Sequence, residues 1–243
     1  MSIAGSRRVE IKGVPRHRGL PLLVHGEAYR HLNLLRIRAA LRERGITDDQ
    51  LLRYSRHIMM PQVELAGQEK LLASRALIVG AGGLGSPAAM YLAAAGVGQL
   101  AIADHDVVDL SNLQRQLLHH EADIGREKVA SASETLHAIN PDIQVTALPC
   151  SLQGEQLNEQ VRLADVVLDC SDNFATRFAV NTACVQQRTP LVSGAAIRME
   201  GQLAVFDPRR PDSPCYRCLY KEGEEADQTC TENGVLAPVV GII

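Results

Sequence analysis

Glycines in one short loop are the first residues whose spacing indicates chemistry. The loop Gly80-Ala-Gly82-Gly83-Leu-Gly85 directly follows the apolar run 76–79. A glycine turn between a buried strand and a helix lets the backbone approach a phosphate, and the helix offers free N–H groups to an anion. Asp104 comes nineteen residues after Gly85, where a carboxylate accepts from ribose hydroxyls. The pattern predicts a nucleotide site, with an unliganded tight turn as the alternative, and it leaves mononucleotide or dinucleotide open.

The run that begins at Asp104 resembles the signature of a known family. It reads Asp104-His-Asp106-Val-Val-Asp109-Leu-Ser-Asn112-Leu-Gln-Arg115-Gln116. This is similar to the MoeB/ThiF family of ubiquitin-activating-type enzymes, whose members adenylate the C-terminal Gly-Gly of small sulfur-carrier proteins. The resemblance spans roughly residues 50–243. Its other motifs follow in family order: Arg53-Tyr-Ser-Arg56, Lys128, Asp169-Cys-Ser-Asp172-Asn173, Ser193 to Gly201 and Cys215-Tyr-Arg-Cys218.

The resemblance implies a role for each polar residue of these motifs. Asp104 would hold the ribose, and Asp172 would bind magnesium. Arg56 would reach across the interface of a homodimer to the ATP of the second subunit. The remaining implied nucleotide contacts are Gly80, Gly82, Gly83, Gly85, Asp106, Asn112, Arg115, Gln116 and Lys128.

Adenylation chemistry suits this set of residues. A carboxylate attacks the α-phosphate of ATP and pyrophosphate leaves, so the site must neutralise charge on three phosphates. Arg115 and Lys128, with magnesium on a carboxylate, would supply that charge. Each residue also has a plainer interpretation: Lys128 as a solvated helix residue, Arg115 as a surface ion pair, and Asp172 as the N-cap of the next helix.

The pair Cys215-x-x-Cys218 has the spacing of zinc ligands, although a structural zinc needs four. The family carries a second Cys-x-x-Cys near its C-terminus. The apolar run 235–243 stops as if a helix were starting, so we expect a further C-terminal segment that would complete the zinc site. A redox dithiol is the alternative.

Cys230 lies on a polar loop, where ThiF-like members carry a cysteine that joins covalently to the carrier. Its thiolate could attack an acyl-adenylate, because AMP is a good leaving group. An exposed cysteine without a role is the alternative. Cys170 and Cys184, by contrast, have the surroundings of core cysteines.

The elements that must position these residues alternate in the α/β manner. We expect strands over 76–79, 99–103, 144–148, 166–169, 190–193 and 202–206. We expect helices over 47–56, 67–73, 86–95, 111–119, 126–140, 155–163 and 175–187. This order predicts a Rossmann-like α/β fold, a largely parallel twisted sheet with helices on both faces and a helical N-terminal extension.

Charge divides the chain into two predicted parts. Residues 1–45 carry a formal charge of +7 and the other 198 residues −10. We interpret 1–45 as a basic, partly flexible arm with one helix, and 46–243 as the ATP-binding adenylation domain. No apolar run reaches the ~18 residues of a membrane span, and 1–15 lack the pattern of a secretory signal. Six cysteines without such a signal indicate the cytoplasm. The absence of Trp and an aromatic content of 3% argue against base-stacking surfaces for single-stranded nucleic acid, and we expect neither a nucleic-acid nor a membrane partner.

The leading hypothesis is adenylation of the small subunit of molybdopterin synthase, because the segment 193–201 has a MoeB-like character. Its rival is the same chemistry on the thiazole sulfur carrier. A sulfur-donating enzyme is a further expected partner. Two other classes stay open: an NAD-dependent oxidoreductase, which would not need Arg115, and a non-catalytic module that docks the carrier.

Overall fold

The computed structural model describes residues 46–221 and 234–243, and the chain divides into two compact units, 1–48 and 49–243. The predicted basic arm and Cys230 therefore lie outside the described residues. None of the helices within the described residues has the length and apolar character needed to cross a membrane. The domain boundary drawn at residue 45 stays a prediction.

One six-stranded sheet forms the centre of the second unit, with the strand order β3-β2-β1-β4-β5-β6. The strands are β1 Arg75–Val79, β2 Gln99–Ala103, β3 Gln144–Leu148, β4 Val166–Asp169, β5 Leu191–Ile197 and β6 Glu200–Phe206. Neighbouring strands from β3 to β5 pair in parallel, and only β6 runs antiparallel to β5. The largely parallel Rossmann-like sheet is thus confirmed.

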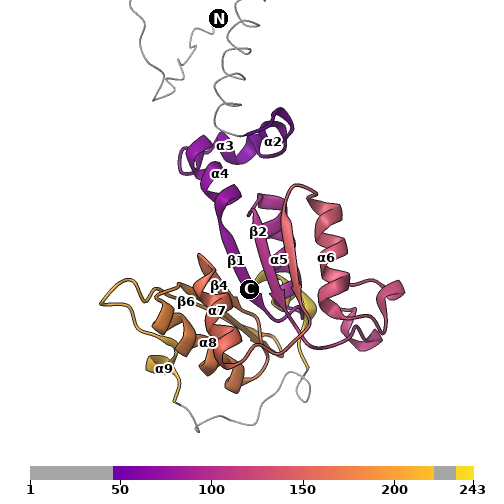
Figure 1. Ribbon diagram of the computed structural model, residues 1–243. Coiled ribbons are helices and arrows are strands. Elements are labelled where there is room, and N and C mark those ends of the chain that lie inside the picture. The colour runs from indigo at the N-terminus through magenta and orange to yellow at the C-terminus, as the bar shows by residue number, and fades with distance from the viewer. Residues whose placement is uncertain (1–45, 222–233) are drawn as a thin grey trace, which may run out of the picture. The chain divides into compact units, whose positions relative to one another are not determined.

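Helices cover both faces of this sheet, as predicted. The helices of the described chain are α2 Asp48–Arg53, α3 Ser55–Ile58, α4 Glu64–Ala73, α5 Gly85–Ala95, α6 Lys128–Ile139, α7 Gly154–Arg162, α8 Phe174–Gln187, α9 Tyr216–Leu219 and α11 Ala237–Ile242. Alternate residues of β1 point to opposite faces, so Leu77 joins one core cluster with α7 and α8, and Ile78 joins another with α5 and α6 (Figure 1). The apolar run 76–79 is buried on both sides for this reason.

The helix expected over 111–119 is wrong. The segment forms the short 3₁₀ helix η1, Leu110–Asn112, and then successive turns. Asp109 caps η1 because its Oδ1 accepts hydrogen bonds from the backbone N–H and the hydroxyl of Ser111. Such side-chain bonds compete with a continuous helix ladder. The turns bring Arg115 and Gln116 next to the glycine loop.

Two other boundaries differ from the sequence prediction. The helix expected over 47–56 is interrupted at Tyr54, which is buried and whose hydroxyl accepts from Asn140 Nδ2 at 2.8 Å. The strand expected over 190–193 continues to Ile197, because β5 and β6 form a hairpin that turns at Arg198 with a φ of +54°. Hairpin turns that need a positive φ are usually predicted from Gly, Asn or Asp. Arg198 is none of these, so the sequence does not predict this hairpin.

Candidate nucleotide site

A cavity of about 390 Å³ opens at the carboxyl ends of β1, β2 and β4. The strand order reverses between β1 and β4, the position where ligands bind in open α/β sheets. The structure brings most of the predicted nucleotide residues together here. The cavity wall includes Gly80, Gly82, Gly83, Asp104, Asp106, Arg115, Gln116, Lys128 and Asp172.

Gly85, Asn112 and Arg56 do not line this cavity. A Cβ at Gly85 would lie 1.9 Å from the carbonyl oxygen of Gly80, so this glycine allows the start of α5 to pack on the loop. Asn112 lies in η1, where its Nδ2 is 3.4 Å from Ser111 Oγ. Arg56 is exposed on α3, a helix at the amino-terminal side of β1 (Figure 1).

Asp104 joins the end of β2 to the glycine loop. Its Oδ2 accepts a hydrogen bond from the N–H of Ala81 at 2.8 Å, and its Oδ1 accepts from the N–H of Asp106 at 2.9 Å. A carboxylate has about four acceptor positions, so capacity remains for a ribose hydroxyl. Gly80 adopts a φ of +101°, and a Cβ there would lie 2.7 Å from the carbonyl oxygen of Cys170. Only glycine fits this turn.

Lys128 begins α6 and pairs with Asp106, with 2.8 Å between Nζ and Oδ2. Its side chain is only 7% exposed, so the solvated-helix interpretation is wrong. The hydrogen bond from Lys128 lowers the pKa of Asp106, which therefore stays ionised beside the ammonium group. The pair holds a positive charge at a fixed place in the cavity wall.

Arg115 is the second cation of the wall. Its Nη1 donates to the carbonyl oxygen of Ser111 at 3.1 Å. No carboxylate within residues 46–221 and 234–243 lies at ion-pair distance from its guanidinium, so the surface ion-pair interpretation is wrong for the described chain. The remaining donors of Arg115 are available to a phosphate.

Gln116 is buried against the glycine loop. Its Nε2 lies 3.7 Å from the place a Cβ would take at Gly82. Its Oε1 has no hydrogen-bond partner within the described chain. Leaving a buried polar atom without a hydrogen-bond partner costs folding free energy. Because Gln116 lines the cavity, its Oε1 could accept a hydrogen bond from a bound ligand.

Asp172 lies three residues after the end of β4 and is exposed at the cavity. The N-cap of α8 is Asn173, whose Oδ1 accepts from Thr176 N at 2.9 Å, so the N-cap interpretation of Asp172 is wrong. The Asp172 carboxylate accepts no hydrogen bond from the described residues, and a free carboxylate at a phosphate site fits a magnesium ligand. Ligand atoms of Asp104, His105 and Asp106 also lie within 4.8 Å of one another, but these two carboxylates already accept from N–H groups and from Lys128, whereas that of Asp172 does not.

Arg177 also lines the cavity, and the sequence analysis missed it. It is buried on α8, 3.8 Å from Asp169, and it donates to the carbonyl oxygens of Ser171 and Gly194. Its contacts join the loop after β4 to β5. Its only sequence signal was a charged residue inside an otherwise buried helix face.

The cysteines separate into two groups. Cys215, the N-cap of α9, and Cys218 within α9 have their Sγ atoms 3.7 Å apart, and neither residue lines the nucleotide cavity. No third cysteine, histidine or carboxylate of the described residues completes a metal site there. Cys170 and Cys184 pack in or against the core clusters, as expected, and burial raises the pKa of each thiol to about 12. Cys170 also lines the nucleotide cavity, together with Cys150.

The fold and the cavity define an α/β nucleotide-binding domain whose cavity wall holds Arg115, Lys128 and the free carboxylate of Asp172. The ThiF family model matches residues 54–243, and the chain belongs to this family. It is 50% identical over 198 residues to the sulfur carrier protein ThiS adenylyltransferase of Escherichia coli (strain K12), with 82% of this chain and 78% of that protein covered. It is 49% identical over 198 residues to the molybdopterin-synthase adenylyltransferase of the same strain, covering 82% and 79%.

Solved structures agree with the fold. The chain resembles Escherichia coli MccB in complex with AMPCPP and MccA, with a TM-score of 0.68 and 25% identity. The match covers 78% of this chain and spans about three fifths, 59%, of that chain. Escherichia coli TcdA, a tRNA N6-threonylcarbamoyladenosine dehydratase, matches with a TM-score of 0.59 and 25% identity over 63% of this chain and 64% of its own.

Proposed function

We propose that this chain adenylates the C-terminal Gly-Gly carboxylate of a ubiquitin-like sulfur-carrier protein and releases pyrophosphate. The observation that carries the proposal is the convergence of Arg115, Lys128 and the free Asp172 on one cavity beside a glycine loop. Two relatives with about 50% sequence identity to this chain are named as the adenylyltransferases of ThiS and of molybdopterin synthase. ATP is the nucleotide that such enzymes use. We favour the small subunit of molybdopterin synthase as the carrier.

In the proposed reaction a carboxylate oxygen of the carrier forms a bond to the α-phosphorus of ATP. The bond between the α-phosphorus and the bridging oxygen breaks, and pyrophosphate leaves with that electron pair. Arg115 and Lys128 stabilise the charge that develops on the phosphates. The free carboxylate of Asp172 would hold magnesium, which supplies Lewis-acid stabilisation of the phosphate oxygens when bound. Asp104 would accept from the ribose.

Three accessory roles belong to the same proposal. Arg56 would complete the ATP site of a second subunit in a homodimer, and its exposure on α3 supports that role. Cys215 and Cys218 would supply two of four zinc ligands. The Cys230 thiolate would attack the carbonyl carbon of the acyl-adenylate, form a thioester with the carrier and release AMP, and a sulfur-donating enzyme would be a further partner. The free thiols of the described cysteines favour a cytoplasmic setting.

The test is exchange of labelled pyrophosphate into ATP by the full chain with each purified carrier. We expect exchange with the molybdopterin-synthase small subunit and none with the same carrier lacking its last two glycines. Exchange with the thiazole carrier alone would overturn the choice of partner. No exchange with either carrier, together with tight binding of NADH and none of ATP, would overturn the reaction class.

A further inference from the structure

Ala81 is the single non-glycine residue of the loop 80–83. Both its backbone N–H and its carbonyl oxygen form hydrogen bonds with side chains. Its N–H donates to Asp104 Oδ2 at 2.8 Å. Its carbonyl oxygen lies 3.1 Å from His119 Nε2 and 3.4 Å from the hydroxyl of Ser86. His119 is 5% exposed and does not line the cavity. It therefore reaches the nucleotide loop from behind.

The hydrogen-bond partners of His119 decide its tautomer. A carbonyl oxygen only accepts, so Nε2 carries a proton and donates to Ala81. Burial lowers the pKa of His119, so the ring is neutral near pH 7 and its Nδ1 accepts. The hydroxyl of Ser131 lies 2.9 Å from Nδ1 and can donate to it. The contact between Nδ1 and Ser131 therefore orients the ring so that Nε2 points at the carbonyl oxygen of Ala81.

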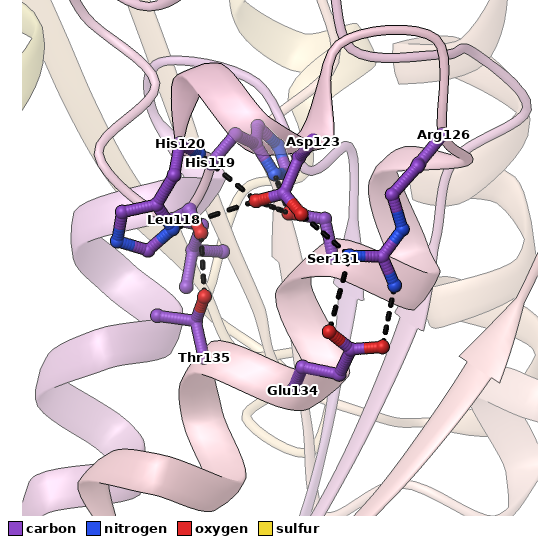
Figure 2. Close-up of polar contacts among 8 residues, drawn as sticks. All are labelled: Leu118, His119, His120, Asp123, Arg126, Ser131, Glu134 and Thr135. Carbon is purple, nitrogen blue, oxygen red and sulfur yellow. Dashed lines mark hydrogen bonds and ion pairs between the residues drawn. The ribbon is translucent and has the colours of Figure 1, made fainter.

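Behind Ser131 the contacts continue through charged groups (Figure 2). The hydroxyl of Ser131 also lies 2.9 Å from Asp123 Oδ2 and has a single proton, so its hydrogen bond to Nδ1 alternates with one to Asp123. Asp123 is held by the backbone N–H of His120 and by Arg126, and Arg126 also pairs with Glu134. Ser131 thus contacts a carboxylate that is itself held by two donors, which fixes the hydroxyl next to the imidazole.

A trans peptide is planar, and its C=O and N–H point in opposite directions. Ala81 and Gly82 share one such unit, so a donor that holds the Ala81 oxygen from behind sets the direction of the Gly82 N–H on the other side. Gly82 lines the cavity, whereas His119 does not. We propose that His119 is a positioning residue that aims the Gly82 N–H at a phosphate of the nucleotide. This inference rests on the proposed function.

A matched pair of variants separates positioning from packing. In His119→Gln the amide nitrogen takes the place of Nε2 and keeps the donor to Ala81, while in His119→Asn it takes the place of Nδ1 and loses that donor. We expect His119→Asn to weaken binding of magnesium ATP about 10-fold, since a buried acceptor loses its donor. We expect His119→Gln to bind within about 2-fold of the wild type. Calorimetric titration of the full chain without carrier measures both.

Two further variants keep the inference testable if His119→Asn does not fold. Ser86→Ala removes only the longer contact to Ala81, and Ser131→Ala removes the partner of Nδ1. We expect Ser131→Ala to weaken ATP binding about 3-fold and Ser86→Ala to have a smaller effect, because neither removes the Nε2 contact. Equal ATP binding by Ser131→Ala and the wild type would overturn the inference.

Equal losses in His119→Gln and His119→Asn would also overturn it, since packing alone would explain them. In pyrophosphate exchange, His119→Asn should raise KM for ATP more than it lowers kcat. A wild type that binds ATP but shows no exchange with any carrier would contradict the proposed function alone, because the calorimetric comparison needs no carrier.

Discussion

The two sides of the nucleotide cavity differ in how their charged groups are held. On the β1–β2 side, Asp104 is bound to backbone N–H groups, Asp106 is paired with Lys128, and Arg115 is anchored on Ser111. On the β4 side, Asp172 accepts no hydrogen bond from the described protein. The first side is organised before any ligand arrives, as suits an anion site, whereas the free carboxylate suits a cation that arrives with the nucleotide.

Each side also has a buried acid that pairs with an arginine next to its loop; Arg177 is buried as well, whereas the side chain of Arg126 is partly exposed. Asp123 and Arg126 lie behind the glycine loop, and Asp169 and Arg177 lie behind the loop after β4. Arg177 lines the cavity, but the carboxylates of Asp123 and Asp169 contact no phosphate in the proposed reaction. They hold the loops that do, so changes in them should affect stability more than chemistry.

The largest effect should come from the organised side. Arg115→Ala removes the guanidinium that has no carboxylate partner in the described chain. We expect pyrophosphate exchange to fall about 1,000-fold, the upper range for loss of one transition-state donor, with the fold unchanged by circular dichroism. Arg162→Ala is the matched control, because Arg162 is exposed on α7 and pairs with Glu159. Unchanged exchange in Arg115→Ala would refute the role assigned here.

On the β4 side, a change at Asp172 should alter the magnesium requirement of the reaction. In Asp172→Asn the side chain keeps its size and loses its charge, so we expect exchange to fall about 100-fold. Titration of magnesium at constant ATP should require more metal for half-maximal exchange than the wild type does. Asp142→Asn, an exposed carboxylate after α6, is the control. An unaltered magnesium requirement in Asp172→Asn would remove the contrast between the two sides.

The free energy of unfolding should depend on the Asp123–Arg126 pair behind the glycine loop. Burial alone would raise the pKa of Asp123, but hydrogen bonds from His120, Ser131 and Arg126 outweigh it and lower that pKa to about 2. Because the folded pKa lies below the ordinary value of 3.8, the contribution is present above about pH 4 and is lost as the pH falls through 2.

Asp123→Asn should therefore lower the free energy of unfolding at pH 7 by on the order of 1 kcal/mol, with solvent screening at this loop allowed for. Urea unfolding at pH 7, 5 and 3 measures the difference between variant and wild type, which should shrink toward the lowest pH. Glu159→Gln, which disrupts an exposed ion pair, should change stability little. A difference that stays constant with pH would contradict the ionised network.

The smallest effect should come from the cysteine pair. Cys215→Ser with Cys218→Ser leaves the nucleotide cavity intact, because neither residue lines it. We expect the affinity for ATP to change less than about 2-fold, while zinc measured per chain falls to background. A larger loss of ATP affinity would mean that the two parts are coupled.

Much of this protein follows from local patterns. The strands β2, β3 and β4 coincide with the predicted ranges, since short apolar runs between turn residues need no distant partner to be recognised. Parallel strands bring their carboxyl ends to one edge of the sheet, so Gly80, Asp104 and Asp172 had to lie near one another. The family signature over 104–116 indicated the chemistry before the geometry was known.

Other features were decided only by contacts between distant segments. The sequence pattern over 111–119 indicated a helix, but Asp109 and the packing under the glycine loop favour turns. Whether Asp172 or Asn173 caps α8 depends on side-chain geometry that spacing does not encode. His119 had no signal at all, because its importance lies in a hydrogen bond to Ala81, a residue 38 positions earlier in the chain. The sequence by itself determined most of the groups that meet at the cavity, because the carboxyl ends of parallel strands share one edge of the sheet. The tertiary structure added Arg177, left Asn112 and Arg56 outside the cavity, and decided which groups are already bound and which remain free.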